Sequence, residues 1–316
     1  MKLLSALIHY PHRKVLTVAL ISFFSVLLTC FSIYGAGSYG IALFILVPLF
    51  IGAGSTIVYG YNRKITRAEA WEISWITLIV FSFGLMACAV EGLICIVMAA
   101  PFAFALTWIG SLIGQTLLNR TMKSGIYLII LMCSIPATAF VEKDNRSELT
   151  SVTTTVDIKA DPETVWQNVI RFPRLKIPRE LLFKTGIAYP IDAQIDGHGV
   201  GAVRRCNFTT GSFVEPITVW DEPKLLKFAV QEQPAPMKEI SFWDIDAPHL
   251  HDYFVSKQGQ FRLVKLKNGY TRLSGTTWYY HNIRPAFYWR IWSNYIIHAI
   301  HERVLSGIKA NAEKGN

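Results

Sequence analysis

The side chains with the clearest potential for metal chemistry lie in the second half of this 316-residue sequence. His298, His301 and Glu302 have the spacing that places side chains on one face of a helix. Their order matches neither H-E-x-x-H nor H-x-x-E-H, the helical zinc motifs. We therefore expect no bound metal and no other cofactor. A second polar group has no familiar ligand spacing either: Asp244, Asp246, His249, His251 and Asp252.

Catalysis would need two or more reactive side chains held together. The side chains available as acids, bases or electrostatic groups are Arg204, Arg205, Glu215, His251 and Tyr280, but nothing in the sequence places any two of them side by side. We consider Arg204, His251 and Tyr280 the ones most suited to contribute acid or base. Arg204 and Arg205 are consecutive in an expected strand, so their side chains point to opposite faces and at most one can line a cavity. That arginine could hold an anionic headgroup. We assign no catalytic residue, and enzymatic turnover is the less favoured alternative.

Aromatic side chains recur at spacings suited to a ligand pocket. Trp278 and Tyr280 alternate on one face of an expected strand, and Tyr288, Trp292 and Tyr295 share a helix face. Pockets are mostly apolar and aromatic with a few polar groups, although the same pattern would also suit a plain core. The candidate ligand-binding residues are Arg204, Trp220, Tyr253, Phe254, Trp278, Tyr280, Tyr288, Trp292 and Tyr295.

Short alternating segments separated by turn residues predict an antiparallel sheet in the second half. Asp161 and Pro162 favour the start of a short helix, and Asn282 with Pro285 favours the start of a long one that runs to about residue 310. The expected strands are 151–159, 187–195, 201–209, 212–220, 225–231, 260–266 and 270–280.

Three stretches resemble the START-like proteins of the SRPBCC superfamily, a group of polyketide cyclase, dehydrase and lipid-transport proteins. They are VDIKADPETVW at 156–166, GVGAVR at 199–204 and WDEPKLLKF at 220–228. The resemblance covers about residues 150–312 and implies a helix-grip fold, in which a curved antiparallel sheet surrounds a long C-terminal helix. It also implies a mostly apolar cavity for a hydrophobic small molecule. It supplies no catalytic residue, because fold alone does not fix function.

The connection from 231 to 258 is much longer than the few residues usual between strands. It contains Phe242, Trp243, Tyr253 and Phe254, whose apolar rings disfavour disorder. We expect a lid over the cavity or a contact with the membrane.

Charged residues nearly vanish between 15 and 141. Five apolar stretches there approach the roughly 20 residues that a membrane-spanning helix needs. The last is the weakest, since it is short and contains Pro136; its Ala137-Thr138-Ala139 run also resembles a signal-peptidase site, the less favoured reading. The expected spans are about 15–34, 41–60, 73–90, 93–118 and 125–141.

Basic residues set the expected orientation, because Lys and Arg stay on the cytoplasmic side of a membrane. All eight Lys and Arg of residues 1–141 lie before the first span or after the second and fourth: Lys2, Arg13, Lys14, Arg63, Lys64, Arg67, Arg120 and Lys123. Five crossings then place the N-terminus in the cytoplasm and the second half outside the inner membrane of the cell.

The spans offer little chemistry of their own. Glu91 is most simply a loop carboxylate near an interface, and Gly110 and Gly114 suit close helix packing, within the chain or between two copies of it. The interleaved charges of the second half argue against nucleic-acid binding. We expect membrane lipid or another hydrophobic small molecule, and the bilayer, as partners.

Together these patterns predict an α-helical transmembrane bundle of about five helices at 1–141, a linker at 142–150 and an α+β helix-grip domain at 151–316. The preferred function is membrane-tethered binding or transfer of a lipid or another hydrophobic molecule. The alternatives are a cyclase- or hydrolase-like enzyme acting on a hydrophobic substrate, and a ligand-sensing structural module.

Overall fold

A computed structural model of the chain describes residues 12–120, 123–142, 148–267 and 269–314, so Lys2 and most of the expected linker lie outside the described part. The chain forms two compact units. The bundle unit comprises Met1–Asn145 together with Glu239–Pro248 and Ile283–Pro285, and the helix-grip unit comprises the rest. Two segments from the second half of the chain thus belong to the bundle unit.

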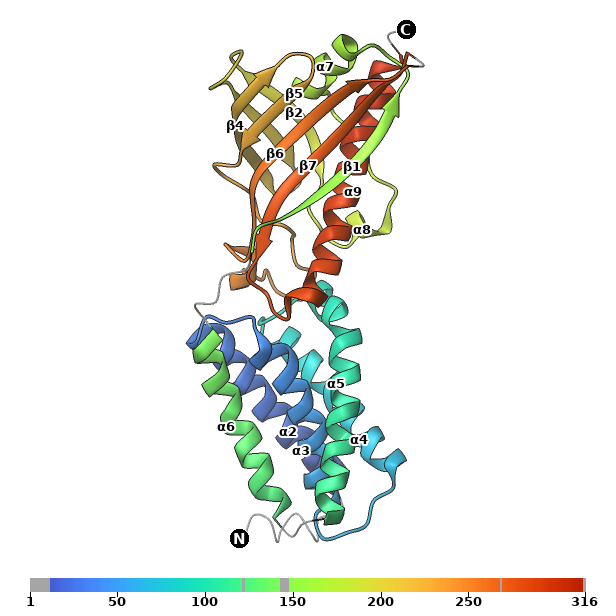
Figure 1. Cartoon of the computed structure of the whole chain (residues 1–316). Helices are drawn as coiled ribbons and strands as arrows, with labels where there is room; N and C mark the ends of the chain where they lie inside the picture. Colours follow the sequence, from blue (N-terminus) through green and yellow to red (C-terminus); the bar gives the residue numbers. More distant parts are fainter. Residues whose placement is uncertain (1–11, 121–122, 143–147, 268, 315–316) are drawn as a thin grey trace. The chain divides into compact units, whose positions relative to one another are not determined.

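Five helices of the bundle unit are long and apolar enough to cross a membrane, as the sequence predicts (Figure 1). The fifth runs through Pro136 as one helix of 19 residues. The first ends in a π-helical turn and the second begins with one. The bounds are α2 Arg13–Cys30 with η1 Phe31–Gly35, η2 Ala42–Leu46 with α3 Val47–Gly60, α4 Arg67–Ala87, α5 Leu93–Arg120 and α6 Ser124–Glu142.

Small residues let α3 and α5 approach closely. A Cβ atom on Gly52 would collide with the carbonyl oxygen of Thr107, and one on Gly110 would collide with that of Leu49. Gly114 faces Ala53 in the same way. Both glycines of the predicted packing motif are thus used within the chain, against α3.

Hydroxyl groups fill the polar positions inside the bundle. Thr77 donates to the carbonyl of Ile73 at 2.7 Å and accepts from Ser55 at 3.0 Å, and Ser74 donates to the carbonyl of Ala70 at 2.7 Å. These side chains satisfy one another and the backbone without introducing a charge.

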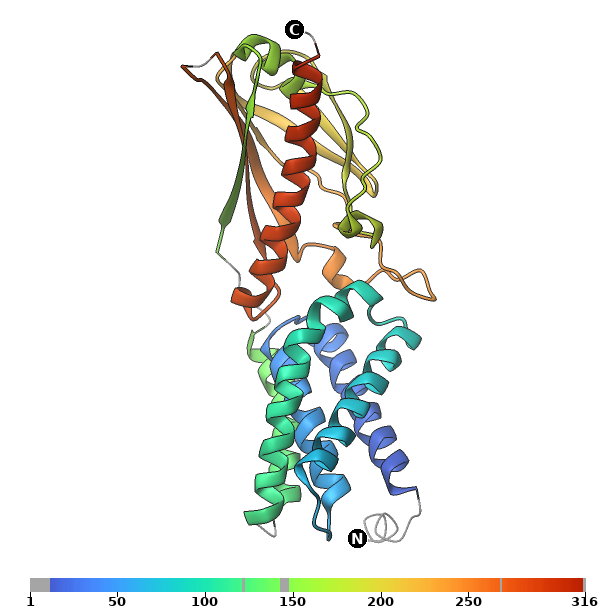
Figure 2. The same cartoon turned by 90° about the vertical axis from the view of Figure 1, so that its right-hand side faces the viewer.

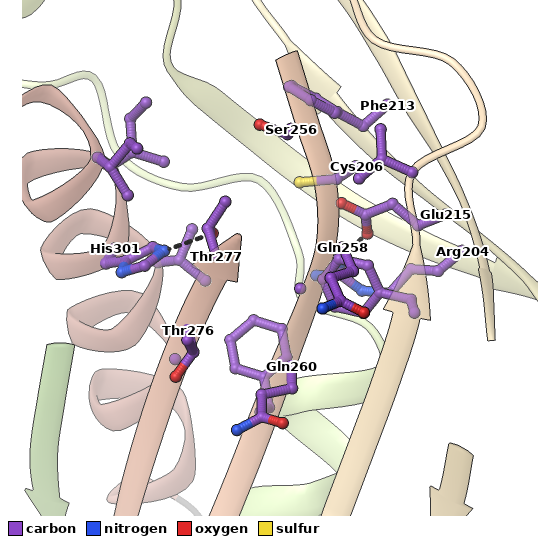
Figure 3. Close-up of a pocket in the computed structure, with 18 of the residues that line it drawn as sticks. Arg204, Cys206, Phe213, Glu215, Ser256, Gln258, Gln260, Thr276, Thr277 and His301 are labelled. Carbon is purple, nitrogen blue, oxygen red and sulfur yellow. Dashed lines mark hydrogen bonds and ion pairs between the residues drawn. The ribbon is translucent and has the colours of Figure 1, made fainter. Parts of the chain in front are cut away.

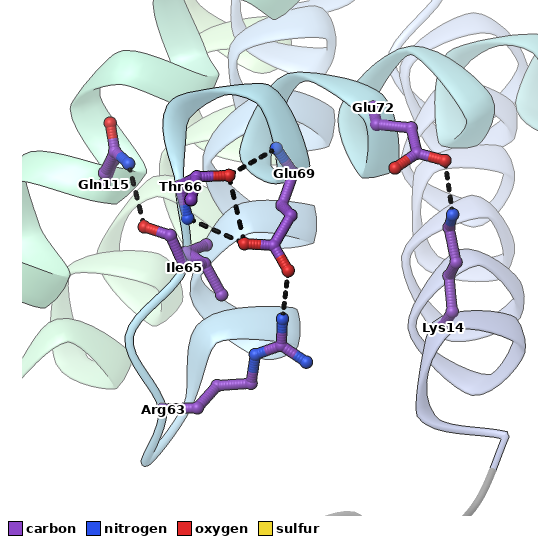
Figure 4. Close-up of polar contacts among 7 residues, drawn as sticks. All are labelled: Lys14, Arg63, Ile65, Thr66, Glu69, Glu72 and Gln115. Atoms are coloured by element: carbon purple, nitrogen blue, oxygen red, sulfur yellow. Dashed lines mark hydrogen bonds and ion pairs between the residues drawn. The ribbon is translucent and has the colours of Figure 1, made fainter.

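One end of the bundle carries basic side chains paired with the carboxylates of α4 (Figure 4). Lys14 contacts Glu72 at 2.5 Å, and Arg63 contacts Glu69 at 2.6 Å. Glu69 also accepts from the backbone N–H of Thr66, whose hydroxyl accepts from the N–H of Glu69, which is a capping box that fixes the start of α4.

Glu142, the last residue of α6, organises the other end of the bundle. Its carboxylate accepts from the backbone N–H groups of Ile41 at 2.8 Å and Ala42 at 3.2 Å, and from the hydroxyl of Ser38 at 3.0 Å. Negative charge is favourable at the start of a helix, where N–H groups are unsatisfied. The fifth helix is therefore joined to the connection between the first two spans.

The helix-grip unit is a seven-stranded antiparallel sheet curled around the long helix α9, which confirms the predicted fold (Figure 2). The strand order is β1-β7-β6-β5-β4-β3-β2. The bounds are β1 Thr150–Ile158, β2 Pro190–Asp196, β3 Val203–Phe208, β4 Gly211–Asp221, β5 Leu225–Ala229, β6 Phe254–Lys265 and β7 Thr271–His281; the helices are α7 Pro162–Ile170, α8 Leu181–Lys184, η3 Pro248–Leu250 and α9 Ala286–Ala312.

The short helix α7 closes one part of the core. Asp161 accepts from the backbone N–H of Thr164 at 2.8 Å, and Pro162 occupies the first turn, as the sequence predicts. Its buried face places Trp166 against Trp220, with ring centroids 5.6 Å apart.

Strand β6 begins at Phe254, six residues before the expected start at Gln260. The pairing of β6 with β7 shifts register between Ser256 and Gln258. Such a bulge interrupts the two-residue alternation by which a strand is recognised in a sequence. The long connection before β6 is correspondingly shorter than predicted.

Candidate ligand-binding cavity

A cavity of about 120 Å³ lies between the concave face of the sheet and α9 (Figure 3). Phenylalanine dominates its apolar lining, to which α9 adds aliphatic side chains. Ligand pockets are commonly about 300–1,000 Å³. A cavity of this volume has room for a small molecule or for one part of a larger one. The phenylalanines that line it are Phe208, Phe213, Phe228, Phe254 and Phe261.

Glycines on two strands make room for this lining. A Cβ atom on Gly259 of β6 would lie 2.5 Å from the ring of Phe228, so glycine lets that ring cross the strand. Gly275 of β7 faces Phe261 and Leu305 of α9 at ordinary contact distance. A larger side chain at Gly275 would project into the space between the sheet and α9.

Arg204 and Glu215 form an ion pair inside the cavity wall. They are directly opposite each other on β3 and β4, and only 1% and 6% of their surfaces are exposed. The Arg204 guanidinium also lies 5.5 Å from the ring centroids of Phe228 and Phe261, a cation–π arrangement. Burial raises the pKa of the Glu215 carboxyl, and the Arg204 charge opposes that shift.

The Nε atom of Arg204 is buried and has no hydrogen-bond partner among the described residues. A buried donor of this kind is costly unless it is satisfied. It gives the cavity a donor that a ligand oxygen could accept from. Cys206, on the same strand, has a pKa raised to about 12 by burial, so its thiol stays protonated and is a poor nucleophile.

His301 of α9 provides a second polar position. Its Nε2 atom lies 2.8 Å from the hydroxyl of Thr277, and its Nδ1 atom lies 3.1 Å from that of Thr154. Burial, with a smaller contribution from His298, lowers the pKa of His301 to about 4. The imidazole is therefore neutral near pH 7, with one nitrogen that donates and one that accepts.

The histidines of α9 whose spacing was considered for a metal site contact a threonine hydroxyl. His298 shares the Thr154 hydroxyl with His301, at 2.8 Å from Nδ1, while Glu302 is exposed. The two imidazoles are thus joined through a threonine hydroxyl. Figure 3 places His301 across the cavity from Arg204 and Glu215.

Two of the nine predicted ligand-binding residues line the cavity, Arg204 and Phe254. Arg205 is on the other face of β3, 3.6 Å from Asp196, which confirms that at most one of the two arginines faces inward. Trp220 packs in the core against Trp166, and Tyr253 precedes β6; neither lines the cavity.

Trp278 and Tyr280 lie on the convex face of β7. Lys227 lies over the Trp278 ring and Lys257 over the Tyr280 ring, each at 5.4 Å from the centroid. The alternate residues of β7, including the fully buried Tyr279, face α9. Trp278 and Tyr280 were expected to line the cavity, but the neighbouring positions of β7 face it instead, because adjacent strand residues point to opposite faces of the sheet.

The inward face of α9 carries Trp289, Ser293 and Ile297. Tyr295 is 55% exposed, and neither it nor the half-buried Tyr288 and Trp292 lines the cavity. Of the three acid–base candidates, Arg204 lines it and His251 and Tyr280 do not. The structure also brings Glu215 and His301 there. Glu215 is one of the five groups that the sequence makes available for acid–base chemistry, whereas His301 was considered only as a metal ligand.

The strand order and the long terminal helix α9 define a helix-grip fold. No family model and no curated protein sequence matches this chain. Solved structures similar to it include a START superfamily protein from Mycobacterium smegmatis, with 14% identity, 52% of this chain and 99% of that chain covered, and a TM-score of 0.34.

Two further solved structures are similar to this chain. Truncated norcoclaurine synthase from Thalictrum flavum has 15% identity, covers 54% of this chain and 94% of its own, and has a TM-score of 0.33. The Aha1 dimer from Colwellia psychrerythraea has 16% identity, covers 53% and 98%, and has a TM-score of 0.31. At these identities the likeness concerns the fold alone.

Proposed function

We propose that the helix-grip unit binds a hydrophobic small molecule that carries a hydrogen-bonding group, and that the bundle keeps this binding site at a membrane. The observation that carries the proposal is the mixed lining of the cavity. Five phenylalanines offer an apolar surface, while Arg204 on one side and His301 on the other offer polar contacts. This combination selects a ligand with an apolar body and an oxygen-bearing end.

A membrane lipid is our preferred ligand. The five apolar helices support a location in a bilayer, where lipid is the most abundant hydrophobic molecule. A whole lipid is larger than the present cavity, so lipid entry requires α9 and the sheet to move apart or a chain to enter only in part. In this proposal the unit exchanges lipid with the membrane or carries it.

Photo-crosslinking tests the ligand in the full-length protein. The probe is a phospholipid with a diazirine in its acyl chain, incorporated into membranes that contain the protein. We expect crosslinks both on the bundle helices, which report contact with the bilayer, and on the cavity segments around Phe254 and Ile297. A free diazirine fatty acid, used in parallel, distinguishes a phospholipid ligand from a smaller one.

A matched pair of β7 variants makes this test specific. Gly275→Leu fills the space between the sheet and α9 and should remove the cavity crosslinks, while Ser274→Leu, on the convex face, should retain them. Crosslinks confined to the bundle with both probes, or equal crosslinking of both variants, would reject the proposed ligand site.

We further propose that the N-terminus is cytoplasmic and that the helix-grip unit lies outside the inner membrane. The support is the basic end of the bundle. Arg13 and Arg67 are the first residues of α2 and α4, and Lys14 and Arg63 pair with carboxylates of α4 (Figure 4). A reporter that is active on one side of the membrane only, fused after Asn316, checks this. Cytoplasmic reporter activity would reject the orientation but not the ligand site.

An enzyme is a second candidate function, because the cavity holds two ionisable groups whose pKa values are both shifted by burial toward the neutral form. The pKa of Glu215 is raised and that of His301 is lowered. Shifted pairs of this kind are typical of acid–base sites. The test compares the masses of crosslinked or bound ligand recovered from the wild type and from His301→Gln; a product formed only by the wild type would favour turnover.

A further inference from the structure

The segment Glu239–Pro248 belongs to the bundle unit, although it comes about a hundred residues after the last apolar helix. Its backbone and side chains hold the turn between α4 and α5. The carbonyl of Ile240 accepts from the N–H of Leu93 at 2.8 Å, and the Trp243 indole donates to the carbonyl of Ala87, the last residue of α4, at 3.1 Å.

This contact brings together three side chains that can bind a metal ion. One donor atom each from Glu91, Cys95 and Glu239 lies within 4.8 Å of the others. Glu91 and Glu239 are only 8% and 6% exposed, and Cys95 is half-buried. The Cys95 thiol contacts a carboxylate oxygen of Glu239 at 2.7 Å.

Gly92 allows this arrangement. A Cβ atom at this position would collide with the carboxylate of Glu239, so the side chain reaches the cluster only across a glycine. Glu91 and Cys95 flank the first residue of α5 with a spacing of four, which places both on one side of the helix start. The cluster therefore depends on one turn, one helix end and one distant segment.

The electrostatics of the cluster favour a cation. Two buried carboxylates beside a thiol repel one another when ionised, and desolvation adds to this cost. The start of α5 also favours nearby negative charge, but the effect of a helix end is modest. A divalent ion would neutralise the charges and join all three side chains.

The donor set also selects the class of ion. Ca²⁺ and Mg²⁺ take oxygen ligands, so a thiolate among three donors disfavours them. Zn²⁺ accepts cysteine sulfur and carboxylate oxygen together, in a four-coordinate site. We propose that Glu91, Cys95 and Glu239 bind a zinc-class divalent ion that fastens the segment Glu239–Pro248 to the end of the membrane bundle.

Metal titration of the full-length protein tests this site. The protein, purified in detergent and stripped with a chelator, is titrated with Zn²⁺, and bound zinc is measured per chain. We expect one tightly bound ion. Cys95→Ser, Glu91→Gln and Glu239→Gln should each weaken affinity by more than about 100-fold, since loss of an outer-shell partner alone typically costs 10–100-fold.

Cys88→Ser is the matched control, because Cys88 is an exposed cysteine at the end of α4 and contributes nothing to the cluster. It should bind zinc like the wild type. Zinc uptake by the wild type no greater than that of Cys95→Ser would overturn the proposal.

A spectroscopic measurement keeps the test decisive if a ligand variant fails to fold. Co²⁺ bound to a thiolate gives an intense sulfur-to-metal charge-transfer band, so the wild type loaded with Co²⁺ should show this band and lose it when Zn²⁺ is added. A Co²⁺-treated wild type without the band would reject Cys95 as a ligand, and with it the proposed site. Neither measurement depends on what the helix-grip cavity binds.

Discussion

The helix-grip cavity and the spaces between the apolar helices contain contrasting kinds of buried polar side chain. Between α3 and α4, Ser55, Ser74 and Thr77 place hydroxyls against one another and against backbone carbonyls. Inside the helix-grip unit, the buried polar side chains of the cavity include ionisable ones, Arg204 and Glu215. A hydrogen-bonded hydroxyl can be buried at little cost in free energy, whereas a buried charge is costly unless its partner is present. The contrast supports our proposal that the apolar helices serve as a scaffold and the cavity as a ligand site.

The largest effect should come from removing one partner of the buried ion pair. Arg204→Met leaves the Glu215 carboxylate buried without its counter-charge, and we expect a loss of about 3–5 kcal/mol in the free energy of unfolding of the helix-grip unit. Denaturant unfolding followed by tryptophan fluorescence measures it. Arg205→Met, an exposed change on the opposite face of the strand, should alter stability by less than about 1 kcal/mol.

The double variant Arg204→Met/Glu215→Leu sharpens this result. Replacing a buried pair by apolar side chains is often neutral or stabilising, so most of the lost stability should return. If the single and double variants were equally destabilised, the pair would not be the cause.

A close helix contact should rank second. Gly52→Ala places a Cβ atom against the carbonyl oxygen of Thr107, and we expect α3 and α5 to separate at a cost of about 1–3 kcal/mol. Thermal unfolding followed by circular dichroism in detergent measures the change. Gly125→Ala, in the first turn of α6 with open space around it, is the control and should be neutral or stabilising. Equal losses in the two variants would contradict this explanation.

Acidification should destabilise the cavity through His301. Its folded pKa of about 4 lies below the ordinary value of 6.5, so the folded state binds the proton more weakly than the unfolded state. The stability is complete above about pH 6.5 and falls as the pH drops toward 4, by up to about 2 kcal/mol at pH 5. Unfolding at pH 7 and pH 5 measures this.

His301→Gln should remove most of that pH dependence, while His298→Gln, an exposed change on the same helix, should retain it. An unchanged slope in His301→Gln would show that another group carries the effect.

The smallest effect should come from a hydroxyl of the bundle. Thr77→Val removes hydrogen bonds to Ser55 and to the backbone of Ile73, and we expect a loss of about 0.6 kcal/mol, typical of such bonds between membrane helices. Thr116→Val, whose exposed hydroxyl bonds only its own helix, is the control for the same thermal measurement. A loss as large as that of Arg204→Met would erase the contrast between the two interiors.

The helices and strands could be predicted because their patterns are local. The turn after β3 determines which residues of β3 and β4 lie opposite each other, and therefore the ion pair. Phe208 pairs with Gly211 across a two-residue turn, and that register puts Arg204 opposite Glu215. A charged residue at 215 between the inward positions Phe213 and Ile217 was a further signal of a buried partner. The sequence thus contained the pair, but we predicted only its arginine.

Which face of β7 and of α9 lines the cavity could not be predicted from the sequence, because both elements carry apolar residues on each side. On β7 the larger rings, Trp278 and Tyr280, are covered by lysines on the convex face, while Gly275 and Thr277 leave space for the cavity. Residue size at the cavity, rather than hydrophobicity, distinguishes the two faces. The cluster of Glu91 with Glu239 was not visible for another reason: no local pattern links residues this far apart.

The return of the later segments to the bundle unit has a consequence for the order of events during synthesis. The bundle unit includes Ile283–Pro285, which the ribosome makes 143 residues after Glu142 ends the fifth helix. At about 5–20 residues per second, this delay is roughly 7–30 seconds. The apolar helices are thus made well before the turn at Glu91 receives its final neighbours. The bundle unit is complete only after the second half of the chain has been made, because it includes segments from that half. The two halves of the chain therefore cannot be exchanged independently of each other.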